Sequence, residues 1–258
     1  MQDATDRWFF SADPIAAGAG EARLSSEEAN HATRVLRLSA GDLITLFDGA
    51  GGVATAVLPE ADRAPRKPSK QPRGATAEGL RVELRDERRV DPPAAPLTLI
   101  VAACKGPRLE WLVEKCTELG VAELCFARFT RSVVAPGGGS LDKLRRIAIE
   151  SCKQCHRAWL PRITQADSIA GAIESRRNLR LFVAHPQPGA PFFGAAIANA
   201  ADPRRGAAIL IGPEGGITNE EVNFATGRDG VIVRLADHIL RVETAAVACA
   251  AAWAAHGE

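Results

Sequence analysis

The sequence predicts an α/β protein in which a small β-rich part precedes a larger part built on a parallel sheet. Residues 7–58 contain short β-rich runs with turn signals, and from Leu97 onward apolar runs alternate with amphipathic helical patterns. Such alternation is typical of a parallel sheet with helices on its faces. The composition changes between these parts, where residues 59–79 are rich in Pro, Lys and Arg. We therefore expect two domains, residues 1–92 and 93–258.

The bulk composition excludes several classes of protein. The chain has 258 residues and a net charge of +1, so a surface that binds nucleic acid must be a local patch. The N-terminus lacks a basic start followed by a long apolar run, so we expect no signal peptide, no membrane span and a cytoplasmic protein. In that compartment the six cysteines are expected to be free thiols.

The first part is predicted to contain one helix and a hairpin. Ser25 and Glu28 form a capping-box pattern at the helix start. Helical spacing places four apolar residues on one side of that helix: Ala29, Ala32, Val35 and Leu36. In ITLFDGAGGVATAVL, Asp48-Gly49 is a turn signal between two β-rich runs, and strand-like alternation returns in LRVELRDERRV.

The segment 59–79 has few large apolar residues and carries only basic charges between Arg63 and Arg73. This composition favours a linker or insertion rather than a packed element. Two interpretations remain open here, a solvated surface insertion and an arm that contacts RNA.

The second part contains five short apolar runs, each expected to form a strand: LTLIVAA, VAELCFA, LRLFVA, AAILI and GVIVRL. Between them lie helical patterns such as RLEWLVEKCTEL, with Pro107 at its start and Gly120 at its end. Ligands of parallel sheets gather beyond the C-terminal strand ends. The loops that follow these runs are therefore the candidate sites.

The first candidate loop is IGPEGGITNEEV, which follows one of the predicted strands. Thr218 and Glu221 form a capping box, so a helix should begin directly after the loop. The glycines allow close backbone approach and positive φ, which we expect at Gly215. The pattern lacks the features of a P-loop or a dinucleotide fingerprint, and Glu214 would repel an anion. A ligand with a cationic centre or amide donors suits this loop, although a plain strand-to-helix turn has the same composition.

The second candidate loop lies in LADHILRVETAAVACAAAW, after the strand GVIVRL. Arg241 and Glu243 bracket the start of a helix rich in small residues. Glu243 in a first helical turn is also explained by the helix dipole, whereas Arg241 has no such simple explanation. We expect the two loops to converge on one crevice.

The stretch CKQCH, Cys152 to His156, matches the haem c attachment pattern and a redox pattern. We reject both interpretations because there is no export signal and the flanking apolar residues have helical spacing. Core-facing thiols are expected instead.

A set of mostly basic side chains forms a candidate RNA surface. Asn30, Arg34 and Arg37 are spaced to share one helix face, which favours contact with phosphates, although a solvated face is the simpler interpretation. The full set is Asn30, His31, Arg34 and Arg37 in the first part, and Arg131, Lys153 and Arg157 in the second.

These stretches together resemble the RsmE family, the 16S rRNA (uracil-N3)-methyltransferases of the SPOUT class. The resemblance covers most of the chain and is carried by EEANHATRVLRLSAGDLITLFDG, KGPRLEWLVEKCTELGV, RSVV, IAIESCKQCHR, IGPEGGITNEEV and HILRVETAA in that order. It implies an N-terminal PUA-like β-barrel that binds RNA and a C-terminal α/β SPOUT domain with a trefoil knot. It also implies a homodimer that acts on the 30S ribosomal subunit with S-adenosylmethionine as cofactor.

The resemblance assigns the two loops to the cofactor. The residues it places there are Gly212, Pro213, Glu214, Gly215, Gly216, Leu235, Ile239, Leu240 and Thr244. The sequence departs from the family pattern at Ala236-Asp237-His238, where Gly-x-Arg is common, and at Val242, where Thr is common. These departures bear on cofactor affinity and on the geometry of the second loop.

Arg241 and Glu243 are the predicted catalytic residues. Uracil N3 carries a proton at neutral pH, so a site that methylates it must favour the anion, and Arg241 is the candidate for stabilising that charge. Glu243 is either the general base or the group that orients Arg241. No metal is expected, because the methyl donor is already cationic. The alternatives are a non-catalytic RNA-binding or ribosome-assembly protein and an enzyme that uses the glycine loop to bind nucleotide phosphates.

Overall fold

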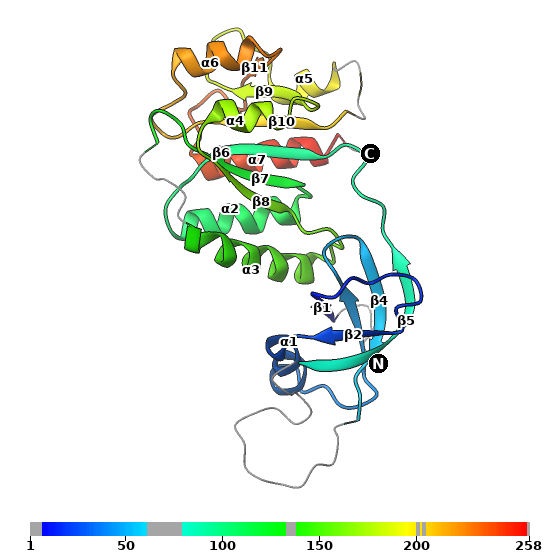
Figure 1. The fold of residues 1–258 in the computed structure, drawn as a ribbon. Helices are drawn as coiled ribbons and strands as arrows, with labels where there is room; N and C mark the ends of the chain where they lie inside the picture. The colour runs from blue at the N-terminus through cyan, green and yellow to red at the C-terminus, as the bar shows by residue number, and fades with distance from the viewer. Residues whose placement is uncertain (1–6, 61–78, 133–137, 200–201, 203–204, 257–258) are drawn as a thin grey trace. The chain divides into compact units, whose positions relative to one another are not determined.

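The structure is a computed structural model that describes residues 7–60, 79–132, 138–199, 202 and 205–256. The chain divides into two compact units (Figure 1). The first contains Met1–Pro92 with Cys152–Leu160, and the second contains Pro93–Ser151 with Pro161–Glu258. Residues 152–160 therefore pack with the first unit although they lie in the second part of the sequence. Residues 61–78 of the basic segment fall outside the described residues.

The first unit is built on a five-stranded sheet with the order β1-β3-β4-β5-β2. Its strands are β1 (Trp8–Phe10), β2 (Glu21–Leu24), β3 (Leu43–Phe47), β4 (Gly52–Val57) and β5 (Leu80–Arg89). β1 pairs with β3 in parallel and the other pairs are antiparallel. The predicted hairpin is confirmed as β3 and β4. The Asp48 carboxylate stabilises its turn by accepting backbone N–H groups of Ala50 at 2.7 Å and Gly52 at 2.9 Å.

The predicted helix of the first unit changes type along its length. It runs as α1 (Ser26–Asn30), with Ser25 as its N-cap, and continues as a π-helix over His31–Val35. The wider π turn shifts the phase of the side chains. Ala29 and Ala32 are buried as predicted, but Val35 is 69% exposed and Leu36 is 44% exposed, so the predicted four-residue apolar face is wrong.

The predicted basic helix face is also wrong, because the helix ends before Arg37. Arg37 has a φ of 55° and therefore leaves the helical path. Arg34 and Arg37 are both exposed, but Arg37 lies beyond the helix and does not share a helix face with Asn30 and Arg34.

The second unit contains a six-stranded parallel sheet with the order β11-β9-β10-β6-β7-β8. The strands are β6 (Leu97–Ala102), β7 (Glu123–Ala127), β8 (Arg162–Ala166), β9 (Arg180–Ala184), β10 (Ala207–Ile211) and β11 (Val231–Val233). All five predicted strands are present. The sixth, β8, was missed because its sequence RITQA is polar and only partly buried at the sheet edge. A strand that is buried on both faces reads as a continuous apolar run, and an edge strand does not.

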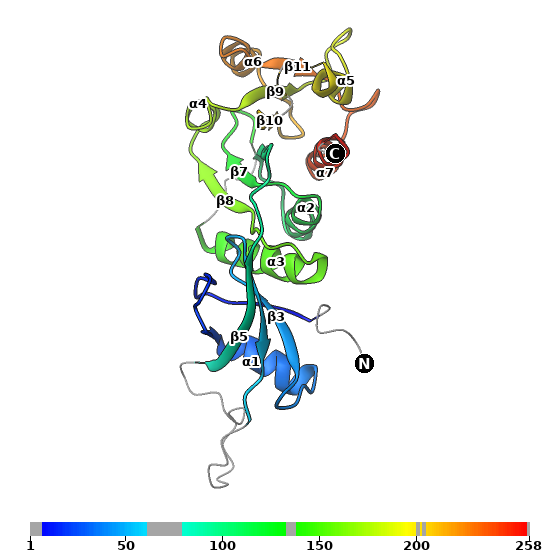
Figure 2. The ribbon, with the colours of Figure 1, turned by 90° about the vertical axis from the view of Figure 1, so that its right-hand side faces the viewer.

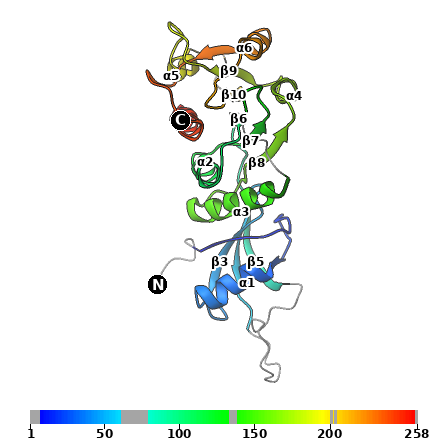
Figure 3. The same cartoon turned by 90° about the vertical axis from the view of Figure 1, so that its left-hand side faces the viewer.

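Helices cover both faces of this sheet. They are α2 (Pro107–Glu118), α3 (Gly138–Cys155), α4 (Ile169–Glu174), α5 (Phe193–Ala198), α6 (Asn219–Thr226) and α7 (Val242–Ala254). Figures 2 and 3 show α2, α5 and α7 on one side of the sheet and α4 and α6 on the other. Alternate residues of β6 serve the two layers: Ile100 packs in the cluster below α4 and α6, and its neighbour Val101 is also fully buried.

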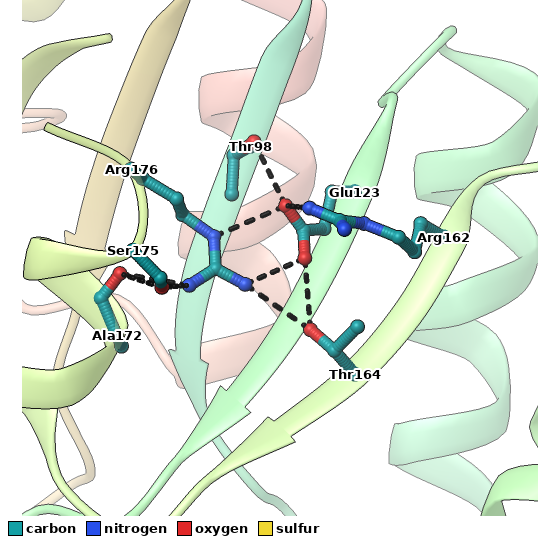
Figure 4. A network of polar contacts seen from close by, with 7 residues as sticks. All are labelled: Thr98, Glu123, Arg162, Thr164, Ala172, Ser175 and Arg176. Atoms are coloured by element: carbon teal, nitrogen blue, oxygen red, sulfur yellow. Dashed lines mark hydrogen bonds and ion pairs between the residues drawn. The ribbon is translucent and has the colours of Figure 1, made fainter. Parts of the chain in front are cut away.

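A buried ion pair lies where the strands of this sheet begin (Figure 4). Glu123 is the first residue of β7, and its carboxylate accepts hydrogen bonds from Arg176 Nε at 3.0 Å, Arg162 Nη2 at 2.9 Å and Thr164 Oγ1 at 2.9 Å. Burial alone would raise the pKa of Glu123, but these donors outweigh it and hold the pKa below the usual value. This ion pair therefore stabilises the edge of the sheet at which the strands begin.

Two further sequence predictions concern the whole chain. All six cysteines are free thiols. Among the described residues, no helix has the length and apolar character needed to span a bilayer. The trefoil knot stays a prediction.

Candidate functional site

A pocket of about 330 Å³ lies at the C-terminal edge of the parallel sheet in the second unit. Its walls come from the segments that follow β9, β10 and β11 and from the first turns of α7. The two predicted loops do converge on it, because both follow parallel strands that end at this edge. Eight of the nine residues predicted to hold the cofactor line the pocket: Gly212, Pro213, Glu214, Gly215, Gly216, Leu235, Ile239 and Leu240. The ninth, Thr244, is exposed on α7 and does not line it.

The glycines of the first loop are required by its packing. A Cβ atom at Gly212 would collide with the side chain of Ile217, and one at Gly215 would lie 3.2 Å from the Cβ of Arg131. The expected positive φ is found at Gly216, where φ is 77°, and not at Gly215. The reason is that the turn of the loop closes one residue later, where the Gly216 N–H donates to Pro213 O at 2.8 Å.

The loop is anchored by the helix that follows it. The predicted capping box is confirmed: Thr218 N–H donates to Glu221 Oε2 at 2.8 Å, and Glu221 N–H donates to Thr218 Oγ1. The other carboxylate oxygen of Glu221 accepts the Thr130 N–H at 2.8 Å. One buried carboxylate thus joins the end of the glycine loop to the segment after β7.

Arg131 lies at this pocket. Its Nη1 donates to the carbonyl oxygen of Gly215 at 2.9 Å, and the residue is part of the pocket lining. Its charge alone predicts that Arg131 belongs to the RNA surface, and that role stays a prediction. In the structure its side chain stabilises the glycine loop through this hydrogen bond.

The second loop contains the departure Ala236-Asp237-His238. Ala236 and His238 line the pocket, but Asp237 does not. The Asp237 carboxylate lies 3.4 Å from Arg234 Nη1 and its side chain is 75% exposed. The added negative charge is therefore paired with Arg234 outside the pocket lining.

The two predicted catalytic residues have different surroundings. Arg241 is the exposed N-cap residue of α7, between Leu240 and Val242, which both line the pocket. Glu243 lies in the first turn of α7 with its side chain only 8% exposed. Its Oε1 is 3.7 Å from Arg108 Nη1, and among the described residues its Oε2 has no hydrogen-bond partner.

Arg108 and His185 are two further residues at this edge of the sheet that no sequence motif predicted. Arg108 is in the first turn of α2 and lies 3.7 Å from both Glu214 Oε1 and Glu243 Oε1. His185 directly follows β9 and lines the pocket, and its buried Nδ1 has no hydrogen-bond partner among the described residues. Both follow a parallel strand at its C-terminal end, which is the one signal in the sequence that points to them.

Among the described residues, neither the Cys104 thiol nor a cluster of metal ligands offers chemistry at this site. Burial and the charge of Glu243 raise the pKa of Cys104 to about 11, so this thiol is protonated at neutral pH and is not a nucleophile. Within the described part of the chain, no group of three or more His, Cys, Asp or Glu side chains is arranged to hold a metal ion.

The residues predicted to bind RNA in the first unit are only partly surface groups. Lys153 Nζ lies 3.1 Å from both carboxylate oxygens of Glu28, and the Lys153 side chain is 8% exposed. The charge of Lys153 is therefore paired inside the first unit, and its part in binding RNA stays a prediction. Asn30 donates to Ser26 O at 2.7 Å. His31 and Arg157 are half-buried.

The comparisons with known proteins agree with this architecture. A family model described as an RNA methyltransferase domain matches residues 91–254, and one described as an RNA methyltransferase PUA domain matches residues 24–63. The fold is thus a PUA domain joined to a SPOUT-like methyltransferase domain, as predicted.

Curated relatives carry the name ribosomal RNA small subunit methyltransferase E. The protein from Bacillus subtilis is 28% identical over 86% of this chain and 85% of its own length. The protein from Synechocystis is 28% identical over 86% of this chain and 69% of its own length. The solved structure of the Neisseria gonorrhoeae protein of that name, bound to S-adenosylmethionine, is 26% identical, covers 95% of each chain and has a TM-score of 0.75. With a family model that spans most of the second unit and these relatives, the chain belongs to the RNA methyltransferase family.

Proposed function

We propose that this protein methylates N3 of a uracil in the 16S rRNA of the small ribosomal subunit, with S-adenosylmethionine as the methyl donor. The observation that carries the proposal is the pocket at the strand ends, bounded by a glycine loop on one side and by Val242 and Ala245 at the start of α7 on the other. Arg241 and Glu243 lie on this helix start but are not part of the pocket lining. Support for the substrate comes from the relatives, which are named as methyltransferases of small-subunit ribosomal RNA.

The residues of the pocket fit S-adenosylmethionine. Apolar side chains such as Leu235 and Leu240 offer surface for an aromatic base, and the glycine loop brings backbone groups close to a ligand. Glu214 adds a carboxylate to the lining, with Arg108 3.7 Å from its Oε1, and this carboxylate suits a cationic ligand. When bound, S-adenosylmethionine supplies a methyl group whose bond to sulfur breaks as the bond to uracil N3 forms.

We assign the proton transfer to Glu243. Its Oε2 is buried and has no hydrogen-bond partner among the described residues, and such a group is costly unless a ligand satisfies it. It would accept the N3 proton, leaving the electron pair on N3 for the new bond. Arg241 would stabilise the negative charge that spreads over N3 and the flanking carbonyl oxygens.

The first unit is proposed to hold the RNA around the target base. N3 lies on the Watson–Crick edge of uracil, so the base must be unpaired or flipped out before it is methylated. Arg34 and Arg37 are exposed and suit contacts to phosphates, with Asn30, His31 and Arg157 nearby in the same unit. We further propose that residues 1–92 form the RNA-binding domain, that residues 93–258 form the methyltransferase domain, and that the protein acts as a cytoplasmic homodimer without a metal.

The test is methyl transfer to a defined substrate. 30S subunits from cells that lack the gene are incubated with the protein and isotope-labelled cofactor, and the 16S rRNA is digested and analysed by mass spectrometry. We expect N3-methyluridine at a single site. Binding of S-adenosylhomocysteine without any transfer would support the non-catalytic alternative, and stabilisation by ATP instead of S-adenosylhomocysteine would support a nucleotide-phosphate enzyme.

A further inference from the structure

Arg108 joins two acidic groups that come from different parts of the second unit. Its Nη1 lies 3.7 Å from Glu214 Oε1 in the glycine loop and 3.7 Å from Glu243 Oε1 in the first turn of α7. Arg108 itself is in the first turn of α2, and α2 packs against α7. One guanidinium therefore connects the loop after β10 with the helix that follows the second loop.

The two carboxylates differ in their need for this cation. The Glu214 side chain is 58% exposed, whereas the Glu243 side chain is 8% exposed. A buried carboxylate without a positive partner carries a large desolvation cost, and an exposed one does not. Arg108 is thus the cation that makes the burial of Glu243 tolerable.

Within the described part of the chain, Arg108 is the cation that forms an ion pair with Glu243. Cys104, which follows β6, is affected by the charges of Glu243, Arg108 and Glu214, and burial keeps it protonated at neutral pH. Glu214 from the glycine loop carries the same sign as Glu243. Of the charged groups that act on Cys104, Arg108 is positive and the two glutamates are negative.

The contact between Arg108 and Glu243 leaves part of the carboxylate available. It uses Oε1 at a distance longer than that of a hydrogen bond, and Oε2 has no partner among the described residues. The arrangement holds the charge in place without consuming the oxygen that a substrate donor would use.

We propose that Arg108 is a positioning residue for methyl transfer, which holds Glu243 through Oε1 so that Oε2 accepts the proton or hydrogen bond of the substrate, and which ties this carboxylate to the glycine loop through Glu214. The inference rests on the proposed function. It assigns Arg108 no contact with the substrate. The effect of Arg108 on the rate is therefore transmitted through Glu243.

The kinetic test uses Arg108→Ala, Arg108→Lys and Glu243→Gln in single-turnover methyl transfer to 30S subunits. Misplacing a catalytic group by about 1 Å costs on the order of 100-fold, so Arg108→Ala should lose between about tenfold and 100-fold in rate. Its KM for 30S subunits should stay within about threefold of wild type, and its Kd for S-adenosylhomocysteine within about fivefold. The reason is that the ion pair between Arg108 and Glu214 in the glycine loop is exposed, and exposed ion pairs contribute little. Arg108→Lys keeps the charge and should recover part of the rate.

The matched control is Arg228→Ala. The Arg228 side chain is 46% exposed, as is that of Arg108, and it ion-pairs with Glu174 on the other side of the sheet. We expect wild-type rates from this variant. Arg108→Ala introduced into Glu243→Gln should cause no further loss beyond about twofold, because coupled residues are not additive.

A second measurement does not depend on catalysis. In the cofactor-free protein, the folding equilibrium constants of Arg108→Ala, Glu243→Gln and the double variant form a cycle, and we expect a coupling of about tenfold between the two residues. This cycle also shows whether the variants fold. If wild-type protein bound S-adenosylhomocysteine but methylated no RNA, the proposed function would be wrong. The folding cycle would still show whether Arg108 holds Glu243, because it does not depend on catalysis.

Four results would overturn the proposal. They are a wild-type rate in Arg108→Ala, an equal loss from Arg108→Ala with and without Glu243→Gln, a rise in the Kd for S-adenosylhomocysteine that matches the loss in rate, and no coupling in the cofactor-free cycle. The third result would assign Arg108 to cofactor binding instead.

Discussion

At the scale of single residues, Arg241 and Glu243 are two positions apart in sequence yet have opposite environments. Arg241 is exposed at the N-cap of α7, whereas Glu243 is buried and ion-paired with Arg108. An exposed guanidinium is free to meet a charge that develops on a substrate, and a buried carboxylate is suited to one fixed proton transfer. The environments therefore support separate roles rather than an Arg241–Glu243 unit.

We predict that Arg241→Ala folds and binds S-adenosylhomocysteine nearly normally but loses most methyl transfer to 30S subunits. Removing one preorganised donor typically costs about 10²–10³ in rate. The measurement is single-turnover transfer, with calorimetry for the cofactor. A rate within about threefold of wild type would refute the catalytic role, since it falls far short of that loss. A large loss of affinity for S-adenosylhomocysteine would instead assign Arg241 to cofactor binding.

At the scale of elements, the glycine loop and the strand starts depend on different interactions. The loop is shaped by close packing around Gly212 and by the hydrogen bond from Arg131 to Gly215. The strand starts are held by the buried pair of Glu123 and Arg176. One edge of the sheet thus carries the pocket and the other carries an ionic anchor.

We predict that Gly212→Ala and Gly215→Val both weaken cofactor binding. In Gly212→Ala the new methyl group collides with Ile217, and in Gly215→Val the larger side chain displaces Arg131. Calorimetry with S-adenosylhomocysteine measures the effect. Gly194→Ala is the control, because a Cβ at Gly194 in α5 meets open space and should leave the affinity unchanged. Unchanged affinity in both loop variants would show that the cofactor does not bind at this loop.

We predict that Glu123→Gln destabilises the second unit by about 3–5 kcal/mol, because it leaves the buried charge of Arg176 without its partner. Urea denaturation followed by circular dichroism measures the free energy of unfolding. Glu174→Gln breaks an exposed pair with Arg228 and should change stability by about 1 kcal/mol or less. A loss in Glu123→Gln no larger than in this control would contradict the prediction.

The same pair sets a pH dependence. The pKa of Glu123 is lower in the folded protein than its usual value of 4.5. Its contribution to stability is therefore complete above that value and is lost as the pH falls through the lowered folded pKa. Wild-type protein should lose stability in this acid range more steeply than Glu123→Gln, which has no carboxylate to protonate at this position.

At the scale of the whole molecule, we predict a homodimer whose dissociation abolishes methyl transfer. Ile239 lies in the pocket lining yet is 84% exposed, and Trp111 on α2 is 42% exposed. The prediction follows from the resemblance to the RsmE family, and the exposure of Ile239 beside the pocket is consistent with cover by a partner subunit. Sedimentation velocity at assay concentrations gives the oligomeric state. An active monomer under these conditions would contradict the prediction.

Much of this fold was determined by local sequence. Apolar runs predicted every strand of the parallel sheet except β8. Pro107 and Gly120 marked the ends of a helix, and the Thr218–Glu221 capping box marked the start of another. These signals succeed because they depend on neighbours within one turn or one strand. The two candidate loops were found for the same reason, since each directly follows an apolar strand.

Contacts between distant segments were decided only by the tertiary structure. No spacing in the sequence indicates that Arg108 meets Glu243, that Lys153 is buried against Glu28, or that β8 completes the sheet. The π-helical turn at His31–Val35 likewise moved Val35 out of the predicted core. Burial and charge pairing depend on which residues the folded chain brings together, and this is why the sequence located the pocket but not the cation that pairs with the buried Glu243.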